Sequence, residues 1–267
     1  MTADRGGARL AELDALRGIA ALAVALYHFV FRYGRHDIVP RQTLTYVFGY
    51  FPVPEHYIGA LPVYLFFMIS GFVIFFTAGN CKTMAQFGFR RFSRLYPVYW
   101  GSILVILLAM AVFGWPDKID AKVILINLTM LQGYVMIPPI ADVFWSLTVE
   151  LSFYFLMALA IGAGMMPFRK PILLLWSVLI FLYGFYDIPN PIPWPIVYLL
   201  VLDYGHFFVF GIAVYELWRA QRAGVTQPDS IIVLLLLISF ASSIIRYPAF
   251  VCAVIFAVHG VFYLAVA

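Results

Sequence analysis

An arginine and a histidine lie in the first long apolar segment of the sequence. The apolar run from Gly18 to Phe31 contains His28, and Arg17 immediately precedes it. A charged arginine in the hydrocarbon layer costs about 2.5 to 17 kcal/mol depending on the measure, so such side chains usually face protein or water. At about 100° per residue, positions 17 and 28 share one helix face and lie ~16 Å apart along the axis. A fixed cation and a titratable base on one face indicate a functional site.

The chemistry that suits this pair is proton transfer from a hydroxyl. Imidazole has a reference pKa of about 6.5, so its neutral form can act as a general base. The alternative is that His28 is a buried structural histidine, hydrogen-bonded between helices.

Glu150 is the second candidate, in the apolar segment 144–154, and Ser146 lies one helical turn earlier on the same face. A carboxyl group in such a segment must be protonated, paired or in contact with water. Ionised, it could orient His28 and stabilise its imidazolium, as the buried aspartate does in hydrolase triads. The alternative is a structural pair with a cation of another helix.

Three arginines cluster in the most basic stretch of the chain, residues 80–96. We expect this stretch to be an inward-facing loop that ends at Pro97, a residue suited to the first turn of the following helix. Arg90, Arg91 and Arg94 either anchor the chain at the inner membrane surface or bind phosphate, to which a guanidinium donates two parallel hydrogen bonds. In the second case Arg17 would add a fourth cation.

Two further polar positions are weaker candidates. Asp203 and His206 are expected on one face of a late span, where they would form a pair or line a proton path. The segment around Ser70 and Gly71 is interpreted as a helix-packing motif, because small residues permit close approach of helices.

The remaining histidines and the two cysteines show no spacing typical of metal ligands or of a disulfide framework, so no metal site is predicted. These residues are His36, His56, His259, Cys81 and Cys252.

The composition identifies the class of protein that must hold these side chains. Of the 267 residues, 64% are hydrophobic and only 11% are charged, whereas soluble domains are about 25% charged. This is typical of an integral membrane protein with helical spans. The net charge of +4 comes mostly from loop Lys and Arg, so it indicates membrane topology and argues against nucleic-acid binding.

We therefore predict an all-α fold, a polytopic transmembrane helix bundle of about eight to nine spans. Residues 123–135 are too short and polar for an ordinary span and are interpreted as a re-entrant segment. The spans are expected near residues 13–33, 57–79, 96–114, 143–165, 171–187, 196–218, 230–246 and 248–267.

The distribution of Lys and Arg predicts the orientation. If 123–135 does not cross, ten basic residues lie on the side of the N-terminus and six on the other; if it crosses, the count is seven against nine. Basic residues prefer the cytoplasmic side, so we predict a cytoplasmic N-terminus in the inner (plasma) membrane. Residues 1–267 are expected to form one domain, and the uncapped apolar run 262–267 suggests a chain truncated at its C-terminus.

Taken together, these motifs resemble the integral-membrane acyltransferase-3 family, whose members O-acylate bacterial surface glycans and related acceptors. Each motif alone is weak, but their order and spacing are specific. The matching stretches are Leu13–Gly18 with His28, Phe66–Phe72, Arg90–Pro97, Trp145–Glu150 and, more loosely, Phe207–Gly211.

The resemblance implies transfer of an acyl group, acetyl in the first instance, from cytoplasmic acyl-CoA to a hydroxyl of an extracytoplasmic carbohydrate or related acceptor. It implies that His28 is the base and Arg17 its motif partner. Arg91 with Arg94 forms a paired-arginine motif, and Glu150 is the acidic position. No permanently bound cofactor is implied, and the expected partners are membrane lipid, acyl-CoA and the acceptor. Family members usually have about ten spans, so this chain departs from the family in length.

Two other functions compete with this one. In a proton-coupled transporter or flippase component, Arg17, His28, Glu150 and Asp203 would form a proton relay. Such proteins often consist of two similar halves, and the sequence shows no such repeat. The third possibility is a truncated, inactive or purely interacting membrane protein.

Overall fold

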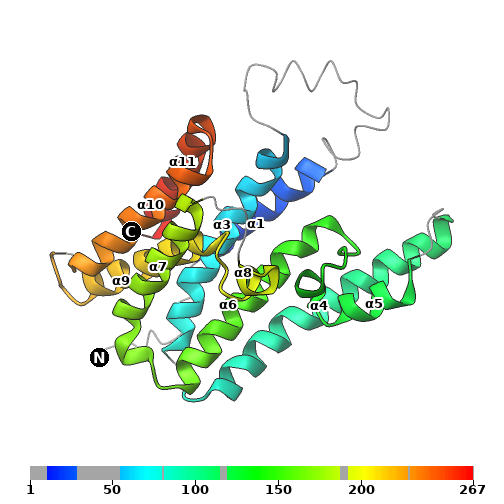
Figure 1. The fold of residues 1–267 in the computed structure, drawn as a ribbon, viewed down its shortest axis with the longest axis horizontal. Coiled ribbons are helices and arrows are strands. Elements are labelled where there is room, and N and C mark those ends of the chain that lie inside the picture. Colours follow the sequence, from blue (N-terminus) through cyan, green and yellow to red (C-terminus); the bar gives the residue numbers. More distant parts are fainter. Residues whose placement is uncertain are drawn as a thin grey trace. The chain divides into compact units, whose positions relative to one another are not determined.

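A computed structural model describes residues 11–28, 55–79, 81–114, 119–186, 192–227 and 229–266. All regular secondary structure in these ranges is helical, as predicted (Figure 1). Five described helical segments are long and apolar enough to cross a membrane. The full number of spans stays a prediction.

The helices differ widely in length, from six to 30 residues. The α-helices are α1 (Ala11–Tyr27), α3 (Glu55–Ala78), α4 (Met84–Phe113), α5 (Ala121–Leu128), α6 (Trp145–Gly162), α7 (Arg169–Tyr186), α8 (Trp194–Leu199), α9 (Gly205–Arg222), α10 (Ser230–Arg246) and α11 (Ala249–Val266). Short 3-10 turns occupy Gln132–Val135, Asp142–Phe144 and Met166–Phe168.

The basic stretch is helical, so the predicted inward loop up to Tyr96 is wrong. Helix α4 begins at Met84, where the Thr83 hydroxyl accepts a hydrogen bond from the Gln86 N–H at 3.1 Å. This cap satisfies one of the unpaired donors of the first turn. Pro97 lies inside the helix rather than at its start. Proline is tolerated within membrane helices, where neighbouring groups satisfy the freed backbone, so it did not mark the boundary.

The expected late span 196–218 is also wrong, because two helices replace it. Helix α8 ends at Leu199, and α9 begins at Gly205. Between them Val201 has φ of 54°, a left-handed conformation that is strongly unfavourable for a β-branched residue and does not continue an α-helix. Hydrophobicity alone could not show this break because both sides of it are apolar.

Segment 123–135 is a short helix followed by a 3-10 turn. The eight residues of α5 reach only ~12 Å, less than the ~30 Å hydrocarbon layer. The Asn127 amide holds the connection that follows, since its Nδ2 donates to the carbonyls of Val123 and Pro138 and its Oδ1 accepts from the Ile140 N–H. The re-entrant position of this segment stays a prediction.

Three aromatic side chains of α4 cap the end of α5. The Tyr99 hydroxyl donates to the Asn127 carbonyl at 2.7 Å. At 2.9 Å, Trp100 donates to the Leu128 carbonyl and Tyr96 to the Thr129 carbonyl. A helix leaves its last carbonyls without partners, so these donors satisfy groups that would otherwise need water.

The described chain divides into two compact units, where the sequence led us to expect one domain. The first comprises Met1–Val73 and His206–Ala267, and the second comprises Ile74–Gly205. The one-domain expectation stays a prediction.

Close contact between α3 and α9 characterises the first unit. A Cβ atom added at Gly71 would overlap the Phe208 carbonyl, and one added at Gly211 would overlap the Met68 carbonyl. The absence of side chains at these two positions therefore lets the two helix backbones touch. This confirms the prediction that Gly71 serves helix packing.

In the second unit, α4 and α6 pack antiparallel. Gly162 at the end of α6 faces Met84 at the start of α4. Further along, the Arg91 guanidinium carbon lies 5.7 Å from the Tyr154 ring centroid, and the rings of Tyr99 and Phe144 are 4.9 Å apart. This order of contacts brings the arginine motif of α4 beside the acidic motif of α6.

Candidate functional site

Helix α1 carries the first two predicted site residues. Arg17 forms an ion pair with Asp14 at 3.5 Å, one turn earlier on the same helix. His28 directly follows α1, and its Nδ1 lies 2.8 Å from the Val24 carbonyl oxygen. A carbonyl only accepts hydrogen bonds, so this contact requires the proton on Nδ1. In the neutral imidazole, Nε2 is then left with a lone pair that can accept a proton.

The three arginines of α4 occupy different environments. Arg91 is buried, whereas Arg90 and Arg94 are exposed. The Arg91 guanidinium donates to the Thr77 hydroxyl and lies 5.4 Å from the Phe87 ring centroid. Arg91 is therefore held by several protein contacts. The other two side chains are exposed, and Arg90 donates from Nη1 to Cys81 Sγ at 3.8 Å.

Glu150 joins this arrangement through Tyr154. The Tyr154 hydroxyl donates to Glu150 Oε1 at 2.6 Å, and the Tyr154 ring also lies within cation–π distance of Arg91. Arg91 and Glu150 interact electrostatically across this contact. The structure thus brings together two predicted site residues from motifs that are far apart in the sequence, in a cluster of Thr77, Arg91, Tyr154 and Glu150.

Tyr154 was not among the predicted site residues, although the sequence contains a signal for it. Tyr154 follows Glu150 by four residues, which places a donor and an acceptor on one helix face. Ser146, by contrast, directs its hydroxyl to the Val143 carbonyl at 3.0 Å.

Asp203 and His206 are not on one helix face as predicted. Asp203 lies in the turn before α9, and His206 lies in the first turn of that helix. His206 is 1% exposed, and neither of its ring nitrogens has a hydrogen-bond partner in the described part of the chain. Across the described ranges, no three His, Cys, Asp or Glu residues gather where they could hold a metal ion.

The predicted site residues divide between the two units. Arg17 and His28 belong to the first unit, and the three arginines, Ser146 and Glu150 to the second. The contact of Glu150 with His28, and the convergence of Arg17 with the other arginines, stay predictions.

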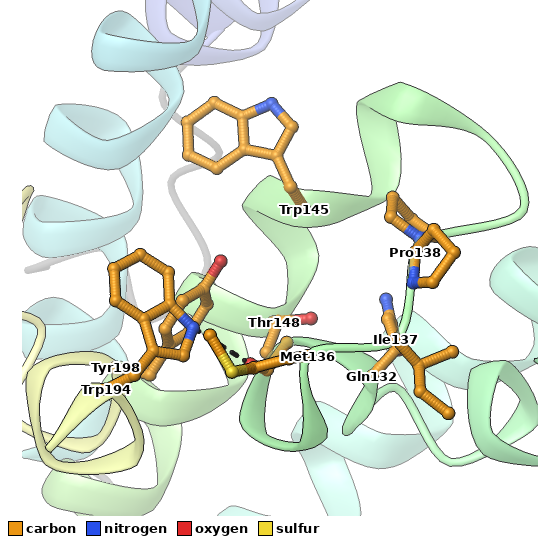
Figure 2. A pocket seen from close by; sticks show the side chains of 10 residues that line it. Gln132, Met136, Ile137, Pro138, Trp145, Thr148, Trp194 and Tyr198 are labelled. Atoms are coloured by element: carbon orange, nitrogen blue, oxygen red, sulfur yellow. Dashed lines mark hydrogen bonds between the residues drawn. The ribbon is translucent and has the colours of Figure 1, made fainter.

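A pocket of about 340 Å³ lies in the second unit. In Figure 2, Trp194 and Tyr198 of α8 line one side, and Ile137 and Pro138 line the opposite side. The Trp194 indole N–H donates to the Gly133 carbonyl at 3.1 Å, and the Thr148 hydroxyl donates to the Met130 carbonyl at 3.1 Å. The lining residues are Gln132, Gly133, Met136, Ile137, Pro138, Pro139, Trp145, Thr148, Trp194 and Tyr198.

The polar groups of this pocket are neutral. Burial raises the pKa of Tyr198, so its phenol keeps its proton at physiological pH. Gln132 is 1% exposed, and neither polar atom of its amide makes a hydrogen bond with a residue that the structure describes. The Tyr99 hydroxyl is near enough to this amide for a weak hydrogen-bonding interaction, but the Tyr99 proton is directed to the Asn127 carbonyl.

Comparisons with known proteins give the same family that the sequence motifs resemble. The family whose sequence model matches residues 10–267 is described as an acyltransferase domain, acyltransferase-3. The protein "Acyltransferase MdmB" of Streptomyces mycarofaciens is 29% identical over 153 residues, which are 55% of this chain and 38% of that relative. No solved structure matches the chain.

Proposed function

Because this chain belongs to the acyltransferase-3 family, we propose that it is a membrane-bound O-acyltransferase. The acyl donor would be cytoplasmic acyl-CoA, in the first instance acetyl-CoA, and the acceptor a hydroxyl of an extracytoplasmic carbohydrate or related molecule. The family match over residues 10–267 carries this proposal. It favours the enzyme over the proton-coupled transporter or flippase.

His28 acts as the base in this reaction. Its Nε2 takes the proton of the acceptor hydroxyl as the oxygen attacks the thioester carbonyl, and the acyl C–S bond breaks to release CoA thiolate. The imidazolium then returns the proton to the thiolate sulfur. The support is the Nδ1 contact with the Val24 carbonyl, which leaves Nε2 free for this role. Arg17 would be the motif partner of His28, and Glu150 would stabilise the His28 imidazolium.

Arg90 and Arg94 bind the phosphates of CoA in this proposal. Both are exposed, and guanidinium groups suit phosphate because they donate paired hydrogen bonds in a fixed plane. Arg91 is instead a positioning residue, since its guanidinium contacts Thr77 and Tyr154. In the predicted topology the protein lies in the inner (plasma) membrane and its N-terminus is cytoplasmic. These arginines would then face the cytoplasmic pool of acyl-CoA.

Acetyl-CoA binding and turnover by the purified protein test the proposal. We expect His28→Ala to abolish turnover while it largely preserves binding, because the base acts only on the acceptor. Arg94→Ala should weaken acetyl-CoA binding by about tenfold, the loss of one charge-assisted contact.

Arg222→Ala is the matched control for the arginine variant. Arg222 is also exposed at a helix end, where it lies 4.3 Å from the Trp218 ring, and it is predicted on the same membrane side. Its replacement should leave acetyl-CoA binding unchanged. If acetyl-CoA neither binds nor turns over in the wild-type protein, the enzyme proposal is wrong for this chain.

A further inference from the structure

The amide of Gln132 is a buried polar group that the fold leaves without partners. Asn127, a second buried amide close by in the sequence, makes three hydrogen bonds and fixes the chain around it. Gln132 makes none with the described residues, although its side chain is 1% exposed and lines the pocket of the second unit. A buried amide that has lost water and gained no partner is destabilising. Such a group is explained if a ligand completes its hydrogen bonds.

We propose that this pocket binds a neutral, hydroxylated ring of the glycosyl class, with Gln132 as its hydrogen-bonding residue. An amide both donates and accepts hydrogen bonds, as a hydroxyl group does, so one side chain can bind a pair of adjacent hydroxyls. The indole rings of Trp145 and Trp194 and the phenol ring of Tyr198 supply flat apolar surfaces for the C–H face of a sugar ring. The pocket volume of about 340 Å³ lies at the lower end of the range for small-molecule sites, about 300–1,000 Å³.

The chemistry of the lining determines which ligands are excluded. None of the ten lining residues carries a charge, so an anionic ligand would lose its hydration without gaining a cation. Thr148 and Trp194 already donate to backbone carbonyls. The side-chain groups that remain for polar recognition include the Gln132 amide and the Tyr198 hydroxyl, and of these the amide both donates and accepts through separate atoms.

The position of the pocket separates it from the phosphate-binding end of the proposed donor site. Trp145 begins α6, and Tyr154, which packs on Arg91, follows nine residues later. This corresponds to about 13 Å along the helix axis. Because α4 runs antiparallel to α6, Arg90 lies beyond this point, farther from the pocket. If the protein is the proposed acyltransferase, the pocket is then a subsite for the acceptor.

The test measures glycoside binding without acyl-CoA. The protein is reconstituted in lipid nanodiscs free of glycoside detergents, and tryptophan quenching is recorded with a panel of neutral p-nitrophenyl pyranosides. Displacement by the corresponding methyl pyranosides shows that the sugar, rather than the nitrophenyl group, is recognised. We expect at least one probe to bind, and Gln132→Leu to weaken it about tenfold while acetyl-CoA affinity is unchanged.

Two matched variants separate ligand binding from folding. Gln86→Leu changes an exposed glutamine of α4 and should leave probe binding intact. Asn127→Leu removes three hydrogen bonds and should lower the melting temperature, whereas Gln132→Leu should keep or raise it because no bond is lost.

The proposal is overturned if no glycoside binds the wild-type protein. It is also overturned if Gln132→Leu weakens the binding of acetyl-CoA instead of the binding of the glycoside, because the acyl-CoA arm would then occupy the pocket. A third contradicting result is a Gln132→Leu variant whose melting temperature falls as much as that of Asn127→Leu. If a glycoside binds through Gln132 but acetyl-CoA neither binds nor reacts, the pocket proposal holds and the enzyme proposal fails.

Discussion

At the scale of single residues, Arg91 and Arg94 show how similar side chains on one helix serve different purposes. Arg91 is 7% exposed and contacts Thr77, Phe87 and Tyr154, whereas Arg94 is exposed. A desolvated cation–π contact contributes up to about 2 kcal/mol. The paired arginines of the motif therefore divide into one that organises the protein and one that is open to ligand.

We expect Arg91→Ala to lower the free energy of unfolding by about 2–4 kcal/mol, because Tyr154 and Glu150 lose their cationic neighbour. Arg94→Ala should change it by less than about 0.5 kcal/mol, as exposed substitutions do. Thermal unfolding, monitored by size-exclusion chromatography, measures the stability of both variants. Equal effects of the two variants would contradict the assignment.

Tyr154→Phe isolates the hydrogen bond to Glu150. It removes the 2.6 Å bond but keeps the ring that packs on Arg91. We expect kcat to fall at least tenfold with little change in the KM for acetyl-CoA, because the carboxylate loses its orientation.

The control is Tyr134→Phe, which removes a bond of the same length to Ser152 and should leave kcat nearly unchanged. A similar fall of kcat in both variants would mean that Tyr154 has only a general structural role.

The sequence identified Arg91 and Glu150 but not how they meet. Glu150 was marked by its charge within an apolar segment, and Arg91 by its place in a cluster of arginines. Their contact through Tyr154 and the orphan amide of Gln132 depend on which helices pack together and in which direction, and one sequence does not contain this information. Gln132 was visible only as a polar residue in a short apolar segment.

At the scale of helices, the contact of α3 with α9 makes a direct prediction. Gly211→Ala should lower the free energy of unfolding by at least about 1–3 kcal/mol, because the new methyl group would overlap the Met68 carbonyl and force the helices apart. The control is Gly260→Ala in α11, where an added Cβ meets no atom within 4 Å. This change should be neutral or stabilising by up to about 1 kcal/mol, from helix propensity. Thermal unfolding of both variants distinguishes these outcomes.

Hydropathy predicted the presence of helices more reliably than the positions of their ends. Helix α4 starts at Met84 rather than near Tyr96, because Thr83 caps it and Pro97 does not interrupt it. Residues 196–218 read as one span, yet Val201 adopts a left-handed conformation between α8 and α9. Caps and turns depend on individual hydrogen bonds, which a window average does not resolve.

At the scale of the whole molecule, the orientation in the membrane is testable with single cysteines in a variant that lacks Cys81 and Cys252. Val135 and Val225 are both exposed. If segment 123–135 does not cross, a membrane-impermeant maleimide added to intact cells should label Val135→Cys and spare Val225→Cys until the membrane is permeabilised. Labelling of Val225→Cys in intact cells would contradict the predicted topology.

The class of the molecule was clear from the sequence, whereas its internal organisation was not. Low charge content identified a membrane protein, and the ordered motifs from Leu13 to Glu150 resembled the family that the chain proved to match. The division into two units follows from contacts between residues distant in sequence, such as Gly71 with Phe208. No local pattern shows that division.

The crossing of α3 and α9 has a consequence for how the protein is made. Gly71 faces Phe208 and Gly211 faces Met68, so each helix offers a glycine to the backbone of the other. A slip by one residue would set Ser70 or Phe72 against a carbonyl, so sterics alone fix the register. Helix α9 begins where the second unit ends, so the whole second unit is synthesised between α3 and α9. The contact that sets the register of the first unit therefore forms only after the second unit has been made.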